Sequence, residues 1–217
     1  MYSGVTNDGG DAESPYFCPS VCDTTVQVGT WFYNKDKALR PLSELIEVYH
    51  TTVGRNCILE LNLTPGGNGL IPDDHVELYE QLGGYIKSCY GESIGEDQAK
   101  HDVSGEDGTY TITFDSPQSI DRIVLMEDQT EGEVIRSYEV QGKVSGGEDG
   151  GNATAADADS WILLSKGTSV GHKKIDRFNK AVEVSEVKVS TTFADTPKWR
   201  SVSVHLCDNS TGEGKSS

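Results

Sequence analysis

The spacing of apolar residues changes part of the way along the chain, and this change limits what the chain can fold into. Over 41–52, and again from Pro72 to Ile86, apolar side chains recur at helical spacing. After Gly108 they alternate with polar residues in short runs separated by turn residues, which is typical of strands. The 217-residue chain therefore predicts an α+β fold, in which a part containing helices precedes an antiparallel β part.

The first part predicts a helix, a strand and a second helix. A helix over 41–52 would bury one apolar stripe and end at Gly54. The following run "CILELNL", interrupted only by Glu60, predicts a strand buried on both faces in a parallel sheet, and "TPGGNGLI" predicts the turn after it. A second helix is expected from Pro72. The expected buried residues of the two helices are Leu42, Leu45, Ile46, Tyr49 and Val53, then Val76, Tyr79, Leu82 and Ile86.

The second part predicts an antiparallel β-sandwich. Its strand-like runs are "TYTITF", "IDRIVLM", "VIRSYEVQG", "SWILL", "VEVSEVKVS" and "RSVSVHL". The glycine-rich and acidic insertion at 145–159 predicts a solvated loop between two of these strands. We therefore divide the chain into a first domain at 1–91, a linker at 92–108, a sandwich at 109–208 and a disordered tail at 209–217.

Composition excludes several classes of partner. The formal charge of −17 repels phosphate backbones, so we expect no nucleic acid partner. No apolar run approaches the roughly 18 residues that span a bilayer, and the N-terminus lacks the pattern of a signal peptide, so we expect no membrane association. The sequence leaves the oligomeric state open.

The cysteines do not follow the spacing of a zinc site. "CPSVC" stands without a second pair of cysteines or histidines, so we expect neither a metal nor another cofactor. Whether Cys22 and Cys57 pair stays open at this point. Glycosylation sequons occur at Asn62, Asn152 and Asn209, but Asn62 lies in an apolar strand, which favours a buried structural side chain there.

Two long stretches resemble a known family. "CDTTVQVGTWFYNKD" and "LSELIEVYHTTVGRNCILELNLTPGGNGLIPDDHVELYEQLGGYI" resemble the C-terminal end of the catalytic domain of α-L-fucosidases of glycoside hydrolase family 29, in its plant-like and bacterial branch. The later runs "RIVLMEDQTEGEVIRSYEVQG", "SWILLSKGTSVGHKKIDRF" and "VSEVKVSTTFADTPKWRSVSVHL" resemble the β-sandwich that follows the barrel in those enzymes, a galactose-binding-like jelly roll. The resemblance implies the last strand and helices of a (β/α)8-type barrel, followed by that sandwich.

The resemblance also implies an activity, which is retaining hydrolysis of terminal α-L-fucosides on fucosylated glycans in a secreted, lysosomal or vacuolar setting. Such a barrel needs about 250 residues, far more than precede the predicted sandwich. By alignment with the family, the nucleophilic aspartate and the acid/base glutamate both fall upstream of Met1. We therefore expect no catalytic residue in this chain and no hydrolysis by the chain alone. Neither Asp23 nor Glu60 is expected to replace them.

The residues expected to bind substrate are Trp31, Tyr33 and Asn62. An aromatic face can cover the apolar C–H surface and methyl group of a deoxysugar, and the family places the stretch from Trp31 to Tyr33 near the fucose pocket. Asn62 ends the predicted strand on the side where barrel sites form. Asn34 stands where relatives often have histidine. The alternatives are that these aromatic residues only fill a core or loop, and that the chain is a lectin-like carbohydrate-binding module without catalysis.

Overall fold

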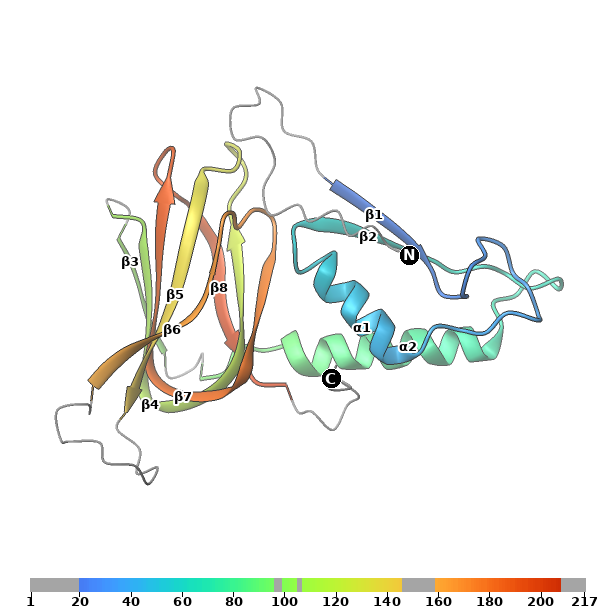
Figure 1. Cartoon of the computed structure of the whole chain (residues 1–217), viewed down its shortest axis with the longest axis horizontal. Helices are drawn as coiled ribbons and strands as arrows, with labels where there is room; N and C mark the ends of the chain where they lie inside the picture. The colour runs from blue at the N-terminus through green and yellow to red at the C-terminus, as the bar shows by residue number, and fades with distance from the viewer. Residues whose placement is uncertain (1–19, 96–98, 105–106, 146–158, 208–217) are drawn as a thin grey trace. The chain divides into compact units, whose positions relative to one another are not determined.

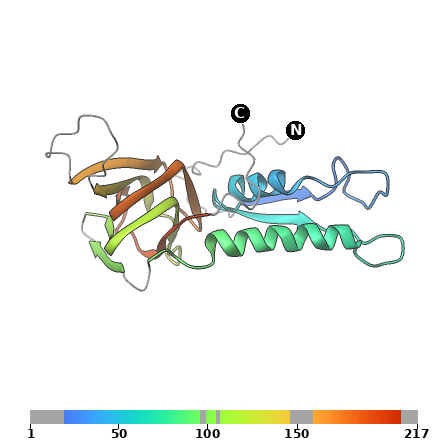
Figure 2. The ribbon, with the colours of Figure 1, turned by 90° about the horizontal axis from the view of Figure 1, so that it is seen from below.

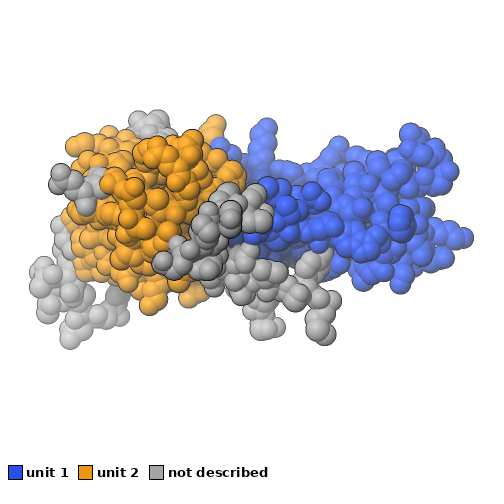
Figure 3. Space-filling view, turned by 90° about the horizontal axis from the view of Figure 1, so that it is seen from above, with its two compact units in different colours: residues 1–5, 18–91, 207–217 blue, residues 6–17, 92–206 orange. Residues whose placement is uncertain are grey.

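The computed structural model describes residues 20–95, 99–104, 107–145 and 159–207. The predicted tail, Cys18, the sequons at Asn152 and Asn209 and nearly all of the predicted insertion lie outside these ranges. The described residues form two compact units, which are 20–91 together with Cys207, and 92–206 (Figure 3). Within the described ranges, neither helix combines the length and apolar character that a membrane-spanning helix needs.

The first unit is a parallel strand pair with two helices. β1 (Ser20–Thr25) pairs in parallel with β2 (Cys57–Asn62), and α1 (Leu42–Thr51) connects them. α2 (Asp73–Tyr90) follows β2, and both helices lie on the same side of the strand pair (Figures 1 and 2). The predicted order of helix, strand and helix is therefore confirmed. β1 was not predicted, because "SVCDTT" is too polar to show a strand pattern.

The two helices differ in how closely they follow the predicted stripes. α1 buries Leu45, Ile46 and Tyr49, as its spacing predicts. α2 buries Leu82 as expected, but Val76 is exposed and the preceding His75 is buried in its place. One residue corresponds to about 100° around a helix, so the buried stripe of α2 is turned away from the predicted one. The residues that form this stripe are His75, Leu78, Leu82, Tyr85 and Cys89.

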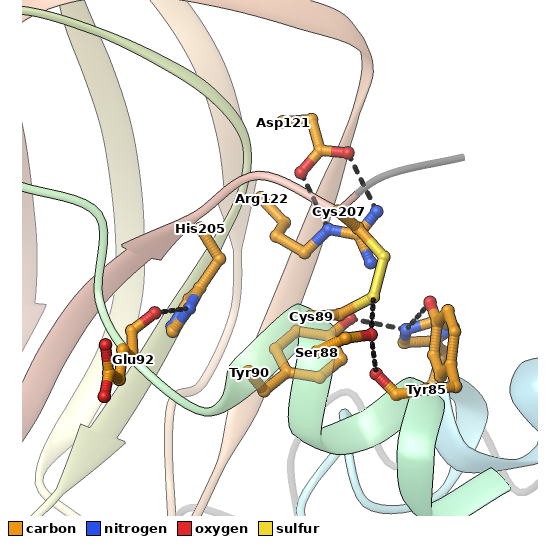
Figure 4. Close-up of a disulfide and its surroundings, with 10 residues drawn as sticks. Tyr85, Ser88, Cys89, Tyr90, Glu92, Asp121, Arg122, His205 and Cys207 are labelled. Carbon is orange, nitrogen blue, oxygen red and sulfur yellow. Dashed lines mark hydrogen bonds and ion pairs between the residues drawn. A yellow bond between two sulfur atoms is a disulfide. The ribbon is translucent and has the colours of Figure 1, made fainter. Parts of the chain in front are cut away.

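Two disulfides lie in the first unit. Cys22 and Cys57, whose pairing the sequence leaves open, form a disulfide. It joins the neighbouring strands β1 and β2, with 5.9 Å between the Cα atoms. Cys89–Cys207 joins the last turn of α2 to the residue that follows the second unit, across 118 residues of sequence (Figure 4). Such cross-links restrict the unfolded chain and each stabilise a fold by about 2–4 kcal/mol.

The second unit is a single antiparallel sheet of six strands in the order β3-β4-β7-β5-β6, with β8 paired to β4. The antiparallel β-rich second half is thus confirmed, whereas its assignment as a galactose-binding-like sandwich stays a prediction. The strand bounds are β3 (Ala99–Ser104), β4 (Thr109–Glu127), β5 (Ile135–Ser145), β6 (Asp159–Gly167), β7 (Lys174–Phe193) and β8 (Trp199–His205).

Two features of this sheet differ from the sequence-based expectation. β3 lies inside the predicted linker at 92–108, where "AKHDVS" forms an edge strand held mainly by backbone pairing with β4. Ala99 is the apolar residue of β3 that packs against the core, and His101 contacts the core residue Tyr110, so no apolar period marks this strand. The predicted runs "TYTITF" and "IDRIVLM" form one strand, β4. The register of β4 against β7 shifts between Thr113 and Gln118, a stretch that contains Pro117, which cannot donate to the ladder.

The core of the second unit contains a buried carboxylate. Glu127 ends β4 and is 1% exposed. Its Oε1 accepts hydrogen bonds from the backbone N–H groups of Val134 (2.6 Å) and Ile135 (3.1 Å), and its Oε2 accepts one from Gly171 (3.2 Å). Burial raises the pKa of Glu127, while these donors act in the opposite direction by favouring the ionised form. The Glu127 side chain thereby connects two loops to the end of β4.

A buried histidine lies at the end of β8. His205 Nδ1 donates to the backbone carbonyl of Glu92 (3.0 Å; Figure 4), and Nε2 accepts from the Ser203 hydroxyl (2.8 Å). Both bonds fit a neutral ring. Burial lowers the pKa of His205 to about 4, and the nearby cations Arg122 and Lys173 add to this effect, while the hydrogen bond to the Glu92 carbonyl and the charge of Asp121 oppose it.

We predict that His205 makes the second unit sensitive to acid. A depressed pKa means that the unfolded chain binds the proton first, so stability is present above pH 6.5 and is lost as the pH falls toward 4. In His205→Gln the fall in unfolding free energy between pH 7 and pH 5 should be smaller by about 1–3 kcal/mol. Urea denaturation at both pH values measures the unfolding free energy. It is followed through the fluorescence of Trp161 and Trp199 in a Trp31→Phe background. An equal fall in both proteins would contradict the prediction.

Candidate functional site

One face of the β1–β2 pair is open. Val21 lies opposite Ile58, and these apolar side chains are 57% and 53% exposed. On the other face Leu61 packs against the core of the two helices. The prediction that β2 is buried on both faces is therefore wrong for the described residues. The reason is that both helices cover the same side of a pair that has only two strands.

Polar side chains follow the same open face toward the carboxyl ends of the strands. Asp23 lies directly opposite Glu60, and both are exposed. Thr25 lies opposite Asn62 at the end of this row. Asn62 is half-buried, and its Oδ1 accepts a hydrogen bond from the Thr64 hydroxyl (3.2 Å). The open face thus presents two carboxylates and, at its carboxyl end, a carboxamide.

Loops from both strands lie at this carboxyl end (Figures 1 and 2). We call residues 29–37 the aromatic loop, because they include Trp31, Phe32 and Tyr33. The three side chains are 49%, 80% and 38% exposed, so the alternative of core aromatics does not hold for them. The loop is closed by a hydrogen bond from the Val28 N–H to the Ala38 carbonyl (3.0 Å), and Gly29 has the positive φ of 70° with which the chain enters it.

A buried glutamine lies beneath the aromatic loop. Gln27 follows β1, and its Nε2 donates to the backbone carbonyls of Asn34 (2.8 Å) and Lys37 (3.1 Å). Its Oε1 accepts from the Asn34 N–H (3.0 Å). The side chain of Asn34 is used within the loop, where Oδ1 accepts from the Asp36 N–H (2.9 Å). Asn34 therefore supports the loop turn, and the position where relatives often have histidine carries a structural residue here.

The first turns of α2 contact the same region. His75 is 1% exposed, and its ring centroid lies 6.0 Å from that of Tyr33. The Tyr79 hydroxyl donates to the carbonyl of Leu61 (2.5 Å), one residue before Asn62. Burial raises the pKa of Tyr79 to about 12, so the hydroxyl keeps its proton at neutral pH. These contacts connect α2 to the aromatic loop and to the end of β2.

The predicted binding residues thus lie at one end of the first unit. Trp31 and Tyr33 share a loop, and Asn62 ends the neighbouring strand. Sequence reasoning missed Gln27 and His75, since a polar residue beside a strand and a histidine in a helix give no signal of their own. Among the described residues no group of three or more His, Cys, Asp or Glu side chains could hold a metal ion.

Comparisons with known proteins agree on one kind of enzyme. No family model matches the chain. α-L-Fucosidase 1 of Arabidopsis thaliana is 22% identical over 215 residues, which cover 86% of this chain and 40% of the relative. A rice protein (Oryza sativa subsp. japonica) assigned as α-L-fucosidase 1 is 30% identical over 73 residues, which cover 34% of this chain and 14% of the relative. The chain therefore spans well under half of the curated relatives that it matches.

A solved structure extends the likeness to the fold. A protein of Bacteroides thetaiotaomicron VPI-5482, assigned as an α-L-fucosidase, is 27% identical with a TM-score of 0.78, and the match covers 92% of this chain and 43% of that one. The fold is thus that of part of a glycoside hydrolase. More narrowly, the chain is similar to the C-terminal region of the family 29 α-L-fucosidases, and the resemblance that its motifs predict is confirmed.

We predict that the Tyr79 hydroxyl stabilises the end of β2. Tyr79→Phe leaves the Leu61 carbonyl without its donor, which should lower the opening free energy of β2 by about 1 kcal/mol. Hydrogen exchange of the amides in 57–62 measures this. Tyr33→Phe, which removes an exposed hydroxyl, is the matched control. Equal exchange rates in both variants would show that the Tyr79 bond contributes nothing.

Proposed function

We propose that this chain forms the C-terminal portion of an α-L-fucosidase. In this proposal residues 1–91 are the last elements of a (β/α)8-type barrel, 92–108 connect them to a galactose-binding-like β-sandwich at 109–208, and 209–217 are a tail. The complete enzyme hydrolyses terminal α-L-fucosides with retention of configuration, and its substrate is a fucosylated glycan. The similarity to fucosidases over most of the chain favours this function over a lectin-like module without catalysis.

The open face of the β1–β2 pair is the observation that carries the proposal. A parallel sheet is normally covered on both faces, yet Val21 and Ile58 are exposed on a pair whose other face bears both helices. In a barrel the outer face packs on helices and the inner face meets the remaining strands. The open face fits this inner position. Its carboxyl end, with Asn62 and the aromatic loop, then belongs to the side where barrel enzymes bind substrate.

The side chains at this end suit a deoxysugar. Trp31 offers an exposed aromatic face to the apolar C–H groups and the methyl group of fucose, with Tyr33 beside it in the loop. The Asn62 carboxamide can donate to and accept from sugar hydroxyls. A family 29 fucosidase of Ruminococcus gnavus, 19% identical with a TM-score of 0.72, has been solved in complex with fucose. This supports the same sugar as the ligand here.

The chemistry itself needs a carboxylate pair that we assign to another part of the enzyme. A retaining glycosidase uses two carboxyl groups about 5 Å apart, of which the acid must hold its proton near neutral pH. Such a raised pKa normally requires burial or a nearby like charge in a dry site. Asp23 and Glu60 lie opposite each other on the open face, and we assign neither of them to that pair. This chain supplies substrate contacts, and the catalytic pair lies in the barrel strands that precede it in the family.

We predict that the 217-residue chain alone releases no chromophore from a chromogenic α-L-fucoside during a day of incubation. The physical reason is that the proposal assigns both the acid and the nucleophile to other strands of the barrel. A fucosidase of the same family, run in parallel, confirms the substrate. Release that disappears in Asp23→Asn or Glu60→Gln would overturn the assignment of the catalytic pair.

We predict that Trp31 contributes to the binding of L-fucose. Trp31→Ala removes an exposed aromatic face and should weaken binding by about tenfold, equivalent to about 1.4 kcal/mol. Saturation-transfer NMR of L-fucose against the chain measures this, and Trp161→Ala in the second unit is the matched control. Equal affinity of wild type and Trp31→Ala would contradict the role of Trp31.

A further inference from the structure

The contacts of Gln27 set it apart from the other polar side chains near the aromatic loop. It is 3% exposed, although it lies between β1 and a loop whose residues 31–38 are all exposed. All its hydrogen bonds described above go to backbone groups of Asn34 and Lys37, which lie 7 and 10 positions further along the chain. The glutamine amide therefore adds side-chain hydrogen bonds to a turn in which the Lys37 N–H also donates to the Asn34 carbonyl (3.1 Å).

These bonds act on the part of the loop that follows the aromatic residues. The Asn34 backbone exchanges two hydrogen bonds with the Gln27 amide, so its position and orientation are both fixed. On the other side of Phe32, the Thr30 hydroxyl donates to the Phe32 carbonyl (2.7 Å) and accepts from its N–H (3.3 Å). The three aromatic residues are thus flanked on both sides by polar contacts, and of their rings that of Tyr33 also packs near His75.

A buried side chain that bonds the backbone of such an exposed loop can stabilise its ordered conformation. Fixing the backbone of each residue costs about 1–2 kcal/mol in conformational entropy, and exposed rings recover little of it through burial. A binding loop that is ordered before the ligand arrives does not spend binding energy on its own ordering. The Gln27 amide is well suited to this task, because a buried carboxamide without its partners would cost about 1–3 kcal/mol.

We propose that Gln27 is a positioning residue for sugar recognition: its buried amide holds the aromatic loop in the conformation in which Trp31 and Tyr33 meet the ligand. The proposal rests on the proposed function for the ligand, L-fucose, but the ordering of the loop can be tested without it. Gln27 acts through the loop backbone and does not touch the sugar.

The ordering of the loop is tested in the full chain labelled with 5-fluorotryptophan. The three tryptophans give three ¹⁹F resonances, and Trp31→Phe identifies that of Trp31. In Gln27→Ala the Trp31 resonance should shift or broaden, while those of Trp161 and Trp199 and the exchange of the β2 amides stay unchanged. Gln27→Glu, which keeps the acceptor but loses both donors, should show the same change. Gln81→Ala, on the exposed side of α2, is the matched control.

An unchanged Trp31 resonance in both Gln27 variants would overturn the proposal. Loss of β2 protection would also overturn it, because Gln27 would then support the whole unit and not the loop. Affinity for L-fucose gives the functional readout. Gln27→Ala should weaken binding by about tenfold, and adding it to Trp31→Ala should cause little further loss. Additive losses would contradict action through the loop. If the wild-type chain binds no fucose, the proposed ligand fails, while the ¹⁹F result still decides the role of Gln27.

Discussion

The parallel pairing of β1 with β2 is the constraint on which the first unit depends. Parallel strands need a crossover connection, and α1 supplies it on the same side as α2. Because the strands run in the same direction, the loops that follow them lie at one edge. The aromatic loop and Asn62 are therefore neighbours in the fold, although residues 38–61 separate them in the sequence. The same pairing leaves one sheet face open.

Buried polar groups fix the loops in both units. Gln27 in the first unit and Glu127 in the second each bond backbone N–H groups of loops that follow later in the chain. Glycine-rich and exposed segments bury too little apolar surface to order themselves. A buried side chain with several satisfied bonds can supply that order, since leaving it unpaired is costly. The Cys22–Cys57 disulfide adds a covalent link at the amino-terminal part of the strand pair, away from the aromatic loop.

The sequence predicted the parts of this fold that leave a periodic trace. α1, β2, α2 and the antiparallel strands follow apolar spacing. The predicted binding residues Trp31, Tyr33 and Asn62, which lie at one end of the first unit, stay a prediction. β1 and β3 were missed because backbone pairing holds them, and backbone groups leave no pattern in the side chains. The exposed face of β2 was missed because "CILELNL" shows which residues are apolar but not which face is covered. Gln27 could not be found, since its partners are carbonyl and N–H groups that every residue has.

From the open face, the aromatic loop and the similarity to fucosidases, we propose that this chain completes a sugar-binding barrel. The most direct test is a chimera in which this chain replaces the corresponding C-terminal region of α-L-fucosidase 1 from Arabidopsis thaliana. Our account predicts hydrolysis of a chromogenic α-L-fucoside within about tenfold of the parent enzyme, a difference of about 1.4 kcal/mol in activation free energy. A folded chimera that shows no hydrolysis above background would contradict it.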